Sequence, residues 1–191
     1  MVKAPCSARL IGRLSKSIRT LGADVGGFAA VEFAMVMPIM VAMLLGCVEV
    51  SDALCVDKRI NVTAGSIGDM VARTTPITKK DISDIFRIGN VLLGRYPTQN
   101  MYSEVVSMEP DAAGVMKVVW SLNNTGSSPY PAGSVYPGNW DNMVGANNSL
   151  IVAKTKYTYV SPIGQFIHGP LTLSHQSSYV SRTAAVRCTN C

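Results

Sequence analysis

Charged side chains are scarce in this sequence. Only 15% of its 191 residues are Asp, Glu, Lys or Arg, whereas 48% are hydrophobic. So little charge beside so much apolar surface indicates that part of the hydrophobic content faces lipid. The length excludes two large domains and suits one modest domain with an appended segment.

Motifs of catalysis are also missing. The sequence holds no HExxH, GxSxG or P-loop pattern. Its scattered carboxylates fit solvated or helix-capping positions better than a paired acid and base. We therefore expect a protein that is not an enzyme and that carries no cofactor and no metal.

Acidic residues are absent from the first 19 positions, which carry Lys3, Arg9, Arg13, Lys16 and Arg19. These five account for the whole formal net charge of +5. A basic cluster ahead of an apolar stretch is typical of a segment that stays on the cytoplasmic side of a membrane. Since no nucleic-acid motif accompanies it, we expect no nucleic-acid partner and assign residues 1–27 to a basic cytoplasmic leader.

The apolar run from Val25 to Val48 contains a single charged residue, Glu32. At about 1.5 Å per helical residue, the run can cross a hydrocarbon core of about 30 Å. It predicts a transmembrane helix at residues 28–50, whose neighbours would tolerate the kink at Pro38. A cleaved secretory signal fits less well, because Glu32 interrupts it. Acylation of Cys47, as in a lipoprotein, stays open.

Helical spacing continues beyond the membrane segment and predicts one helix from Phe28 to about Arg73. Thr78 and Asp81 have the spacing of a capping box, which predicts the start of a second helix that ends at Gly94. We expect five apolar residues to form the buried stripe of this second helix: Ile82, Ile85, Phe86, Val91 and Leu92.

The remaining sequence changes to a period of two. Alternating runs at Tyr102–Glu109 and Val115–Leu122 predict a hairpin, and further strands are expected at Ser149–Val160 and Leu171–Arg182. Residues 123–148 are rich in Asn, Gly, Ser and Pro and predict a long surface loop. The expected fold is α+β: a long amino-terminal helix packed on a second helix and a small antiparallel sheet, with residues 51–191 as an extracytoplasmic domain.

Five cysteines occur in the chain. Cys188 and Cys191 have CxxC spacing and can close a short disulfide in an oxidising compartment. Free or intermolecular thiols stay open, as does a metal or redox site. The pairing of Cys47 and Cys55 cannot be read from the sequence.

Glu32 needs an explanation, because a carboxylate within a spanning helix costs about 2.5–3.5 kcal/mol on insertion scales. One interpretation places it near the cytoplasmic interface, where water lowers that cost. Another starts from a cut after Gly27, which would create an ammonium group on Phe28 and leave Glu32 as a nearby counter-charge.

The run GGFAAVEFAMVMPIMVAMLLG resembles the amino-terminal signature of TadE-like proteins, pilin-like components of the tight adherence (Tad) pilus system. The resemblance is strongest over residues 26–50 and weaker in TAGSIGDMVART and YTYVSPIGQ. It implies that a prepilin peptidase cuts after Gly27, that Phe28 becomes the first mature residue and that Glu32 registers subunits in a filament. Phe33 stands where processed members of the family often have tyrosine.

The resemblance also implies a function. We expect a minor pilin or pseudopilin that helps to assemble a Tad-type pilus for surface adherence, with other pilins or pseudopilins, the Tad secretion machinery, the prepilin peptidase and the membrane as its partners. It would be a single-pass inner-membrane protein with a cytoplasmic amino terminus and a periplasmic domain. The alternatives are a bitopic periplasmic binding or redox module that uses Cys188 and Cys191, and a lipoprotein acylated at Cys47.

Overall fold

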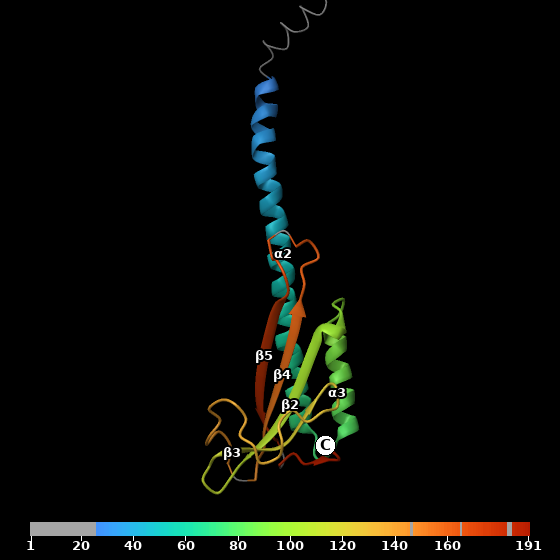
Figure 1. The fold of residues 1–191 in the computed structure, drawn as a ribbon, viewed down its shortest axis with the longest axis vertical. Coiled ribbons are helices and arrows are strands. Elements are labelled where there is room, and N and C mark those ends of the chain that lie inside the picture. Colours follow the sequence, from blue (N-terminus) through green and yellow to red (C-terminus); the bar gives the residue numbers. More distant parts are fainter. Residues whose placement is uncertain (1–25, 146, 165, 183–184) are drawn as a thin grey trace, which may run out of the picture. The chain divides into compact units, whose positions relative to one another are not determined.

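The computed structural model describes residues 26–145, 147–164, 166–182 and 185–191. Within them, the chain divides into two compact units, one ending at Val48 and the other running from Glu49 to Cys191. Helix α2 (Gly26–Arg73) supplies all the described residues of the first unit and the first element of the second (Figure 1). The predicted long helix is therefore confirmed. Most of the predicted leader, residues 1–25, lies outside the described residues.

Within the second unit, α2 is an amphipathic helix. One face carries small and branched apolar residues that are fully buried at intervals of three or four positions: Val56, Ile60, Ala64, Ile67 and Val71. That spacing puts all five side chains on one stripe, which packs against the rest of the domain. Gly68 lies on the same side, where an added Cβ would stand 2.7 Å from the ring of Tyr179. The helix thus approaches the sheet closely at Gly68.

Helix α3 (Lys79–Leu92) begins with the predicted capping box. The Thr78 hydroxyl accepts from the Asp81 backbone N–H at 3.2 Å, and the Asp81 carboxylate accepts from the Thr78 N–H at 2.9 Å. These two bonds satisfy amide groups that have no partner within the helix. Gly94 follows with φ +68°, the left-handed conformation that turns the chain away from the helix.

The predicted stripe of α3 is correct in its first half and wrong in its second. Ile82, Ile85 and Phe86 are buried, but Val91 is 77% exposed and Leu92 is only half-buried. The buried positions continue instead through Gly89 to Leu93. Gly89 has no side chain to reveal its place in an apolar pattern, yet it lies against Ile67 of α2. The buried face of α3 therefore runs through Gly89, where the two helices are close together, and Val91 lies off this face.

Four strands form the antiparallel sheet predicted from the sequence: β2 (Met101–Pro110), β3 (Met116–Asn123), β4 (Leu150–Tyr159) and β5 (Leu171–Val180). A 3-10 turn, η1 (Thr98–Asn100), leads into the first strand. The order is β3-β2-β4-β5, so β2 and β4 are central. The β2–β3 hairpin turns at Asp111, whose carboxylate accepts from the backbone N–H groups of Ala113 and Val115. The fold class is α+β, as expected.

The two faces of the sheet are covered differently. On one face, side chains of α2 and α3 pack against the strands in a core that includes Ile67, Phe86, Val105, Trp120 and Ile151. On the other face, the connection between β3 and β4 folds back, and its Tyr136 and Val144 cover Val106 and Val152. The sheet is therefore a middle layer, and its alternating side chains supply both cores.

A second, two-stranded sheet was not predicted. Strand β1 (Ile77–Thr78) pairs in parallel with β6 (Cys188–Thr189). Nearby, the Trp120 indole N–H donates to the carbonyl of Val186 at 2.8 Å, and Val186 is fully buried. The late segment of the chain is thus part of the main core, next to the connection between the two helices.

Candidate functional site

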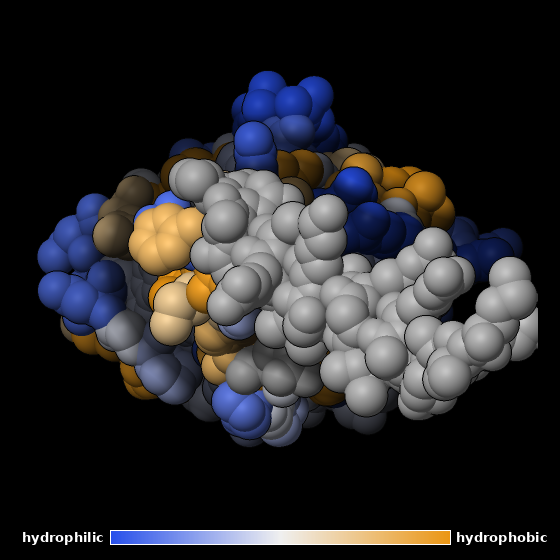
Figure 2. Space-filling model, turned by 90° about the horizontal axis from the view of Figure 1, so that it is seen from above, coloured by the Kyte–Doolittle hydropathy of each residue, from blue (hydrophilic) through white to orange (hydrophobic). Residues whose placement is uncertain are grey.

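The first described segment of α2 is apolar and exposed. Every residue from Gly27 to Leu44 is solvent-exposed, including the large side chains of Phe28 and Phe33. Among the described residues, α2 is the helix long and apolar enough to cross a membrane, and none of its most apolar window is buried. Figure 2 shows the face seen from above, where apolar side chains of the molecule in orange lie at the surface beside hydrophilic ones in blue. A core helix of a water-soluble domain would bury its large apolar side chains, so this segment of α2 is suited to contact with lipid or with other helices.

Glu32 is the single charge on this apolar segment. Its side chain is exposed, and in the described part of the chain no group makes a hydrogen bond or ion pair with it. Gly27 lies more than a helical turn earlier, where an added Cβ would meet no atom within 4 Å. The three predicted residues Gly27, Phe28 and Glu32 therefore share one accessible helix, and in the uncut chain no described group neutralises Glu32.

Glu49 follows directly after the apolar run and is buried, with only 1% of its surface exposed. Its Oε2 accepts hydrogen bonds from the backbone N–H groups of Phe166, at 3.0 Å, and Ile167, at 2.9 Å. A buried carboxylate is tolerated where such donors compensate its lost hydration. Glu49 thus fixes the connection between β4 and β5, which lies 117 residues further along the chain.

Asp52 lies one helical turn after Glu49 and accepts hydrogen bonds from three side chains. It accepts from the hydroxyl of Tyr96 at 2.8 Å, from the hydroxyl of Tyr159 at 3.0 Å and from the guanidinium of Arg95. Burial alone would raise the pKa of Asp52, but the hydrogen bonds from Tyr96, Tyr159 and Arg95 outweigh it and lower the pKa below its ordinary value. We call these four residues the Asp52 cluster.

The Asp52 cluster joins three elements of the second unit. Asp52 lies on α2, Arg95 and Tyr96 follow α3, and Tyr159 ends β4. Burial raises the pKa of Tyr159 to about 12, and the hydrogen bond to Asp52 adds to the effect. The cluster therefore holds a charged acceptor, two hydroxyl donors and one cationic donor, Arg95, the arrangement expected of a structural contact.

The family comparison falls on this part of α2. Residues 27–64 match the family model described as TadE-like protein. We call residues 27–64 the TadE-like segment. The TadE-like segment includes Gly27, Phe28, Glu32, Glu49 and Asp52. No curated protein and no solved structure matches the chain.

Among the described residues, the two cysteines outside the TadE-like segment are bonded to each other. Cys188 and Cys191 form a disulfide with their Cα atoms 5.8 Å apart. Within the segment, Cys47 and Cys55 are free and exposed. The candidate residues thus fall into two groups in different units: the helix residues Gly27, Phe28 and Glu32 in the first, and the disulfide in the second.

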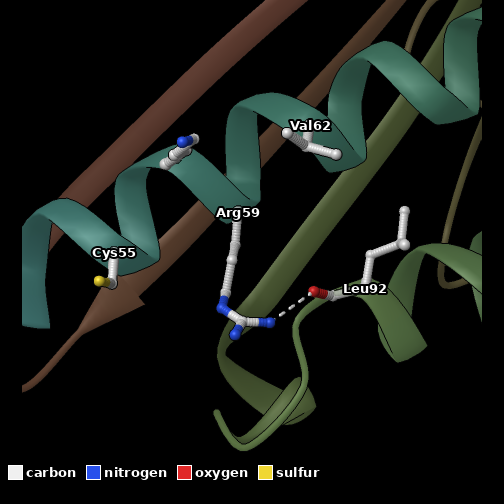
Figure 3. A pocket seen from close by; sticks show the side chains of 5 residues that line it. Cys55, Arg59, Val62 and Leu92 are labelled. Carbon is white, nitrogen blue, oxygen red and sulfur yellow. Dashed lines mark hydrogen bonds between the residues drawn. The ribbon is translucent and has the colours of Figure 1, made fainter.

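A surface pocket of about 370 Å³ lies between α2 and the end of α3, lined by Cys55, Lys58, Arg59, Val62 and Leu92. Figure 3 shows Arg59 reaching from α2 towards Leu92, whose carbonyl accepts from its Nη1 at 3.2 Å. The lining combines two cations with apolar walls and contains no carboxylate. The described lining therefore contains no pair of carboxylates that could act as acid and base.

Sequence reasoning did not find Glu49 and the Asp52 cluster. Each depends on contacts between residues far apart in the chain, such as Asp52 and Tyr159, for which no local pattern exists. One signal was present: two carboxylates, Glu49 and Asp52, stand three positions apart immediately after the apolar run. Carboxylates so close to a membrane face need hydrogen-bond donors, and these had to come from elsewhere in the chain.

Proposed function

We propose that this protein is a pseudopilin of a Tad-type pilus, anchored in the inner membrane by α2, with its second unit outside the cytoplasm. The observation that carries the proposal is the TadE-like segment, whose first part up to Val48 is a largely exposed apolar helix with one carboxylate, Glu32, five positions after Gly27. The role is mechanical and not enzymatic. The apolar helix enters a helical bundle with other pilins or pseudopilins, and the outer domain contacts neighbouring subunits or the Tad secretion machinery.

Processing at Gly27 is the first step of this proposal. A prepilin peptidase would hydrolyse the bond between Gly27 and Phe28 and leave an ammonium group on Phe28. The open space around Gly27 supports access by a protease. The new ammonium, on the same or a neighbouring subunit, would offset the cost of placing the Glu32 carboxylate in lipid. Glu32 would then set the register of one helix against the next.

The mass of the mature amino terminus tests the processing step. In cells that assemble the pilus, we expect the wild-type chain to begin at Phe28 and a Gly27→Leu variant to keep its full length. An uncut wild-type chain would refute processing and leave a static anchor. A lipid on Cys47 would overturn the pseudopilin proposal in favour of a lipoprotein.

Pilus assembly tests the role of Glu32. Glu32→Gln removes the charge while keeping the shape, so we expect pilus production to fall while membrane insertion and protein level stay normal. Asp84→Asn is a matched control, because Asp84 is an exposed carboxylate of α3 in the outer domain. Normal piliation in Glu32→Gln would refute the registration role.

Replacing both Cys188 and Cys191 by serine distinguishes the redox alternative. If the disulfide only stabilises the fold, the double variant should still assemble into pili, and the free energy of unfolding of its outer domain should be lower. Loss of function with normal stability and normal assembly would favour the redox module.

A further inference from the structure

The connection between β4 and β5 is hydrogen-bonded to Glu49, the first residue of the second unit. Glu49 is the residue directly after Val48, and its carboxylate holds the backbone N–H groups of Phe166 and Ile167 at 3.0 and 2.9 Å. Because Glu49 is almost fully buried, this contact is a fixed part of the domain and not a surface hydrogen bond in water.

This connection turns apolar side chains outward. Val160, Ile163 and Phe166 are 61%, 36% and 51% exposed, whereas Ile167 packs inward against a core cluster. The backbone is shaped for this arrangement, since Gly164 has φ +67° and its N–H donates to the Ser161 hydroxyl at 3.2 Å. We call Val160, Ile163 and Phe166 the apolar tip.

The depth of the apolar tip follows from the chain connectivity. At about 1.5 Å per residue, the helix from Phe28 to Val48 covers roughly 30 Å, which matches the hydrocarbon thickness of a bilayer. The headgroup layer adds roughly 5–7 Å on each side. Glu49 therefore lies within that layer if the apolar run spans the membrane. The hydrogen bonds at 2.9 and 3.0 Å bring the backbone of Phe166 and Ile167 to the same depth.

The charge of the connection suits a lipid surface. Between Val160 and Leu171 the sequence contains no Asp, Glu, Lys or Arg, and its one ionisable residue is His168. Apolar and aromatic side chains of a segment without charged residues of its own partition into the headgroup region of a bilayer, and the neighbouring Glu49 carboxylate is buried. A protein partner is less favoured, because the covalent link to the apolar run already brings the tip to the lipid.

We propose that the apolar tip, formed by Val160, Ile163 and Phe166, is a membrane-contact surface that inserts into the headgroup region of a phospholipid bilayer. It gives the outer domain a second attachment besides α2. Together with the Glu49 hydrogen bonds, it sets the orientation of the domain against the membrane before the subunit enters a pilus. This proposal rests on the proposed membrane span of α2.

Depth-dependent quenching tests the proposal in the full-length protein. Phe166→Trp places a tryptophan in the apolar tip, and the protein is reconstituted in vesicles of phosphatidylethanolamine and phosphatidylglycerol with or without brominated acyl chains. Phe33→Trp reports the span, and Val135→Trp is a control at an exposed apolar position in the β3–β4 connection. Each variant is compared with the wild type, which contributes Trp120 and Trp140.

We expect brominated lipid to quench the added emission of Phe166→Trp and of Phe33→Trp, and to leave that of Val135→Trp unchanged. Quenching at Phe33→Trp without quenching at Phe166→Trp would overturn the membrane contact and leave the span intact. No quenching at either position would overturn both. Protection of Phe166→Trp from aqueous iodide without quenching by brominated lipid would mean that protein covers the tip, which also refutes the proposal.

Discussion

Replacing Asp52 by alanine should destabilise the outer domain strongly, because one carboxylate serves three donors. The hydroxyl of Tyr159 would lose its acceptor in a residue that is 2% exposed, and an unsatisfied buried hydroxyl costs about 1–3 kcal/mol. Tyr96 is half-buried and would lose a bond of about 0.5–1.5 kcal/mol. The guanidinium of Arg95 is largely exposed, so its ion pair adds little. We expect a loss of about 2–4 kcal/mol in the free energy of unfolding.

Urea unfolding of the full chain in a mild detergent measures this change. Both tryptophans, Trp120 and Trp140, lie in the outer domain and report its unfolding by fluorescence. Asp84→Ala is the matched control, because Asp84 is an exposed carboxylate that pairs with Arg87 at 3.6 Å. The control should change the free energy of unfolding by less than about 0.5 kcal/mol. An Asp52→Ala protein as stable as the control would refute the structural role of the cluster.

A double-mutant cycle measures the energy of the hydrogen bond between Tyr159 and Asp52 apart from the other effects of removing each side chain. Tyr159→Phe deletes only the hydroxyl that donates to Asp52 at 3.0 Å. If the two residues act through this bond, the effects of Tyr159→Phe and Asp52→Ala should fall short of additivity by about 0.5–3 kcal/mol. Additive effects would mean that the two residues stabilise the domain independently.

Three further predictions concern pH, capping and close packing. The pKa of Asp52 is lowered in the folded protein, so its stabilising contribution is complete above the unfolded pKa of about 4 and is lost as the pH falls through the folded pKa. The urea midpoint of Asp52→Asn should therefore decline less steeply in acid than that of the wild type. Equal slopes would contradict the lowered pKa of Asp52. Thr78→Ala removes the cap of α3 and should lower the free energy of unfolding by about 0.5–2 kcal/mol in the same assay, an expectation that an unchanged midpoint would contradict. Gly68→Leu places a side chain where a Cβ alone stands 2.7 Å from the Tyr179 ring, so a loss of about 1–3 kcal/mol is expected, and wild-type stability would show that the ring moves aside freely.

Local patterns predicted most of the elements. The spacing of Ile60, Ala64 and Ile67 indicated the second half of α2, and Thr78 with Asp81 marked the start of α3. Alternation in Met116–Leu122 identified the strand that follows the hairpin turn. These features depend on neighbours within a few positions, so a single sequence contains their full signal.

Contacts between distant segments could not be predicted in the same way. The parallel pair of β1 and β6 joins Ile77 to Cys188, and two residues on each side are too few for a strand pattern. The stripe of α3 was misjudged because Gly89, a close contact between helices, is not recognised as apolar. Glu49 is a carboxylate next to an apolar run, which is visible in the sequence. Nothing in the sequence indicates that its hydrogen-bond donors are the backbone amides of Phe166 and Ile167.

The position of Val186 in the core has a consequence for biogenesis. Val186 is fully buried, accepts from the indole of Trp120 and precedes the strand that pairs with Ile77. In a chain that crosses the membrane with its amino-terminal side retained, residues 186–189 are translocated long after α2 has been inserted. In such a chain the second unit would complete its core only after translocation of these residues. Until then its helices and sheet would expose apolar surface, and in this interval the growing protein would most need a chaperone on the far side of the membrane.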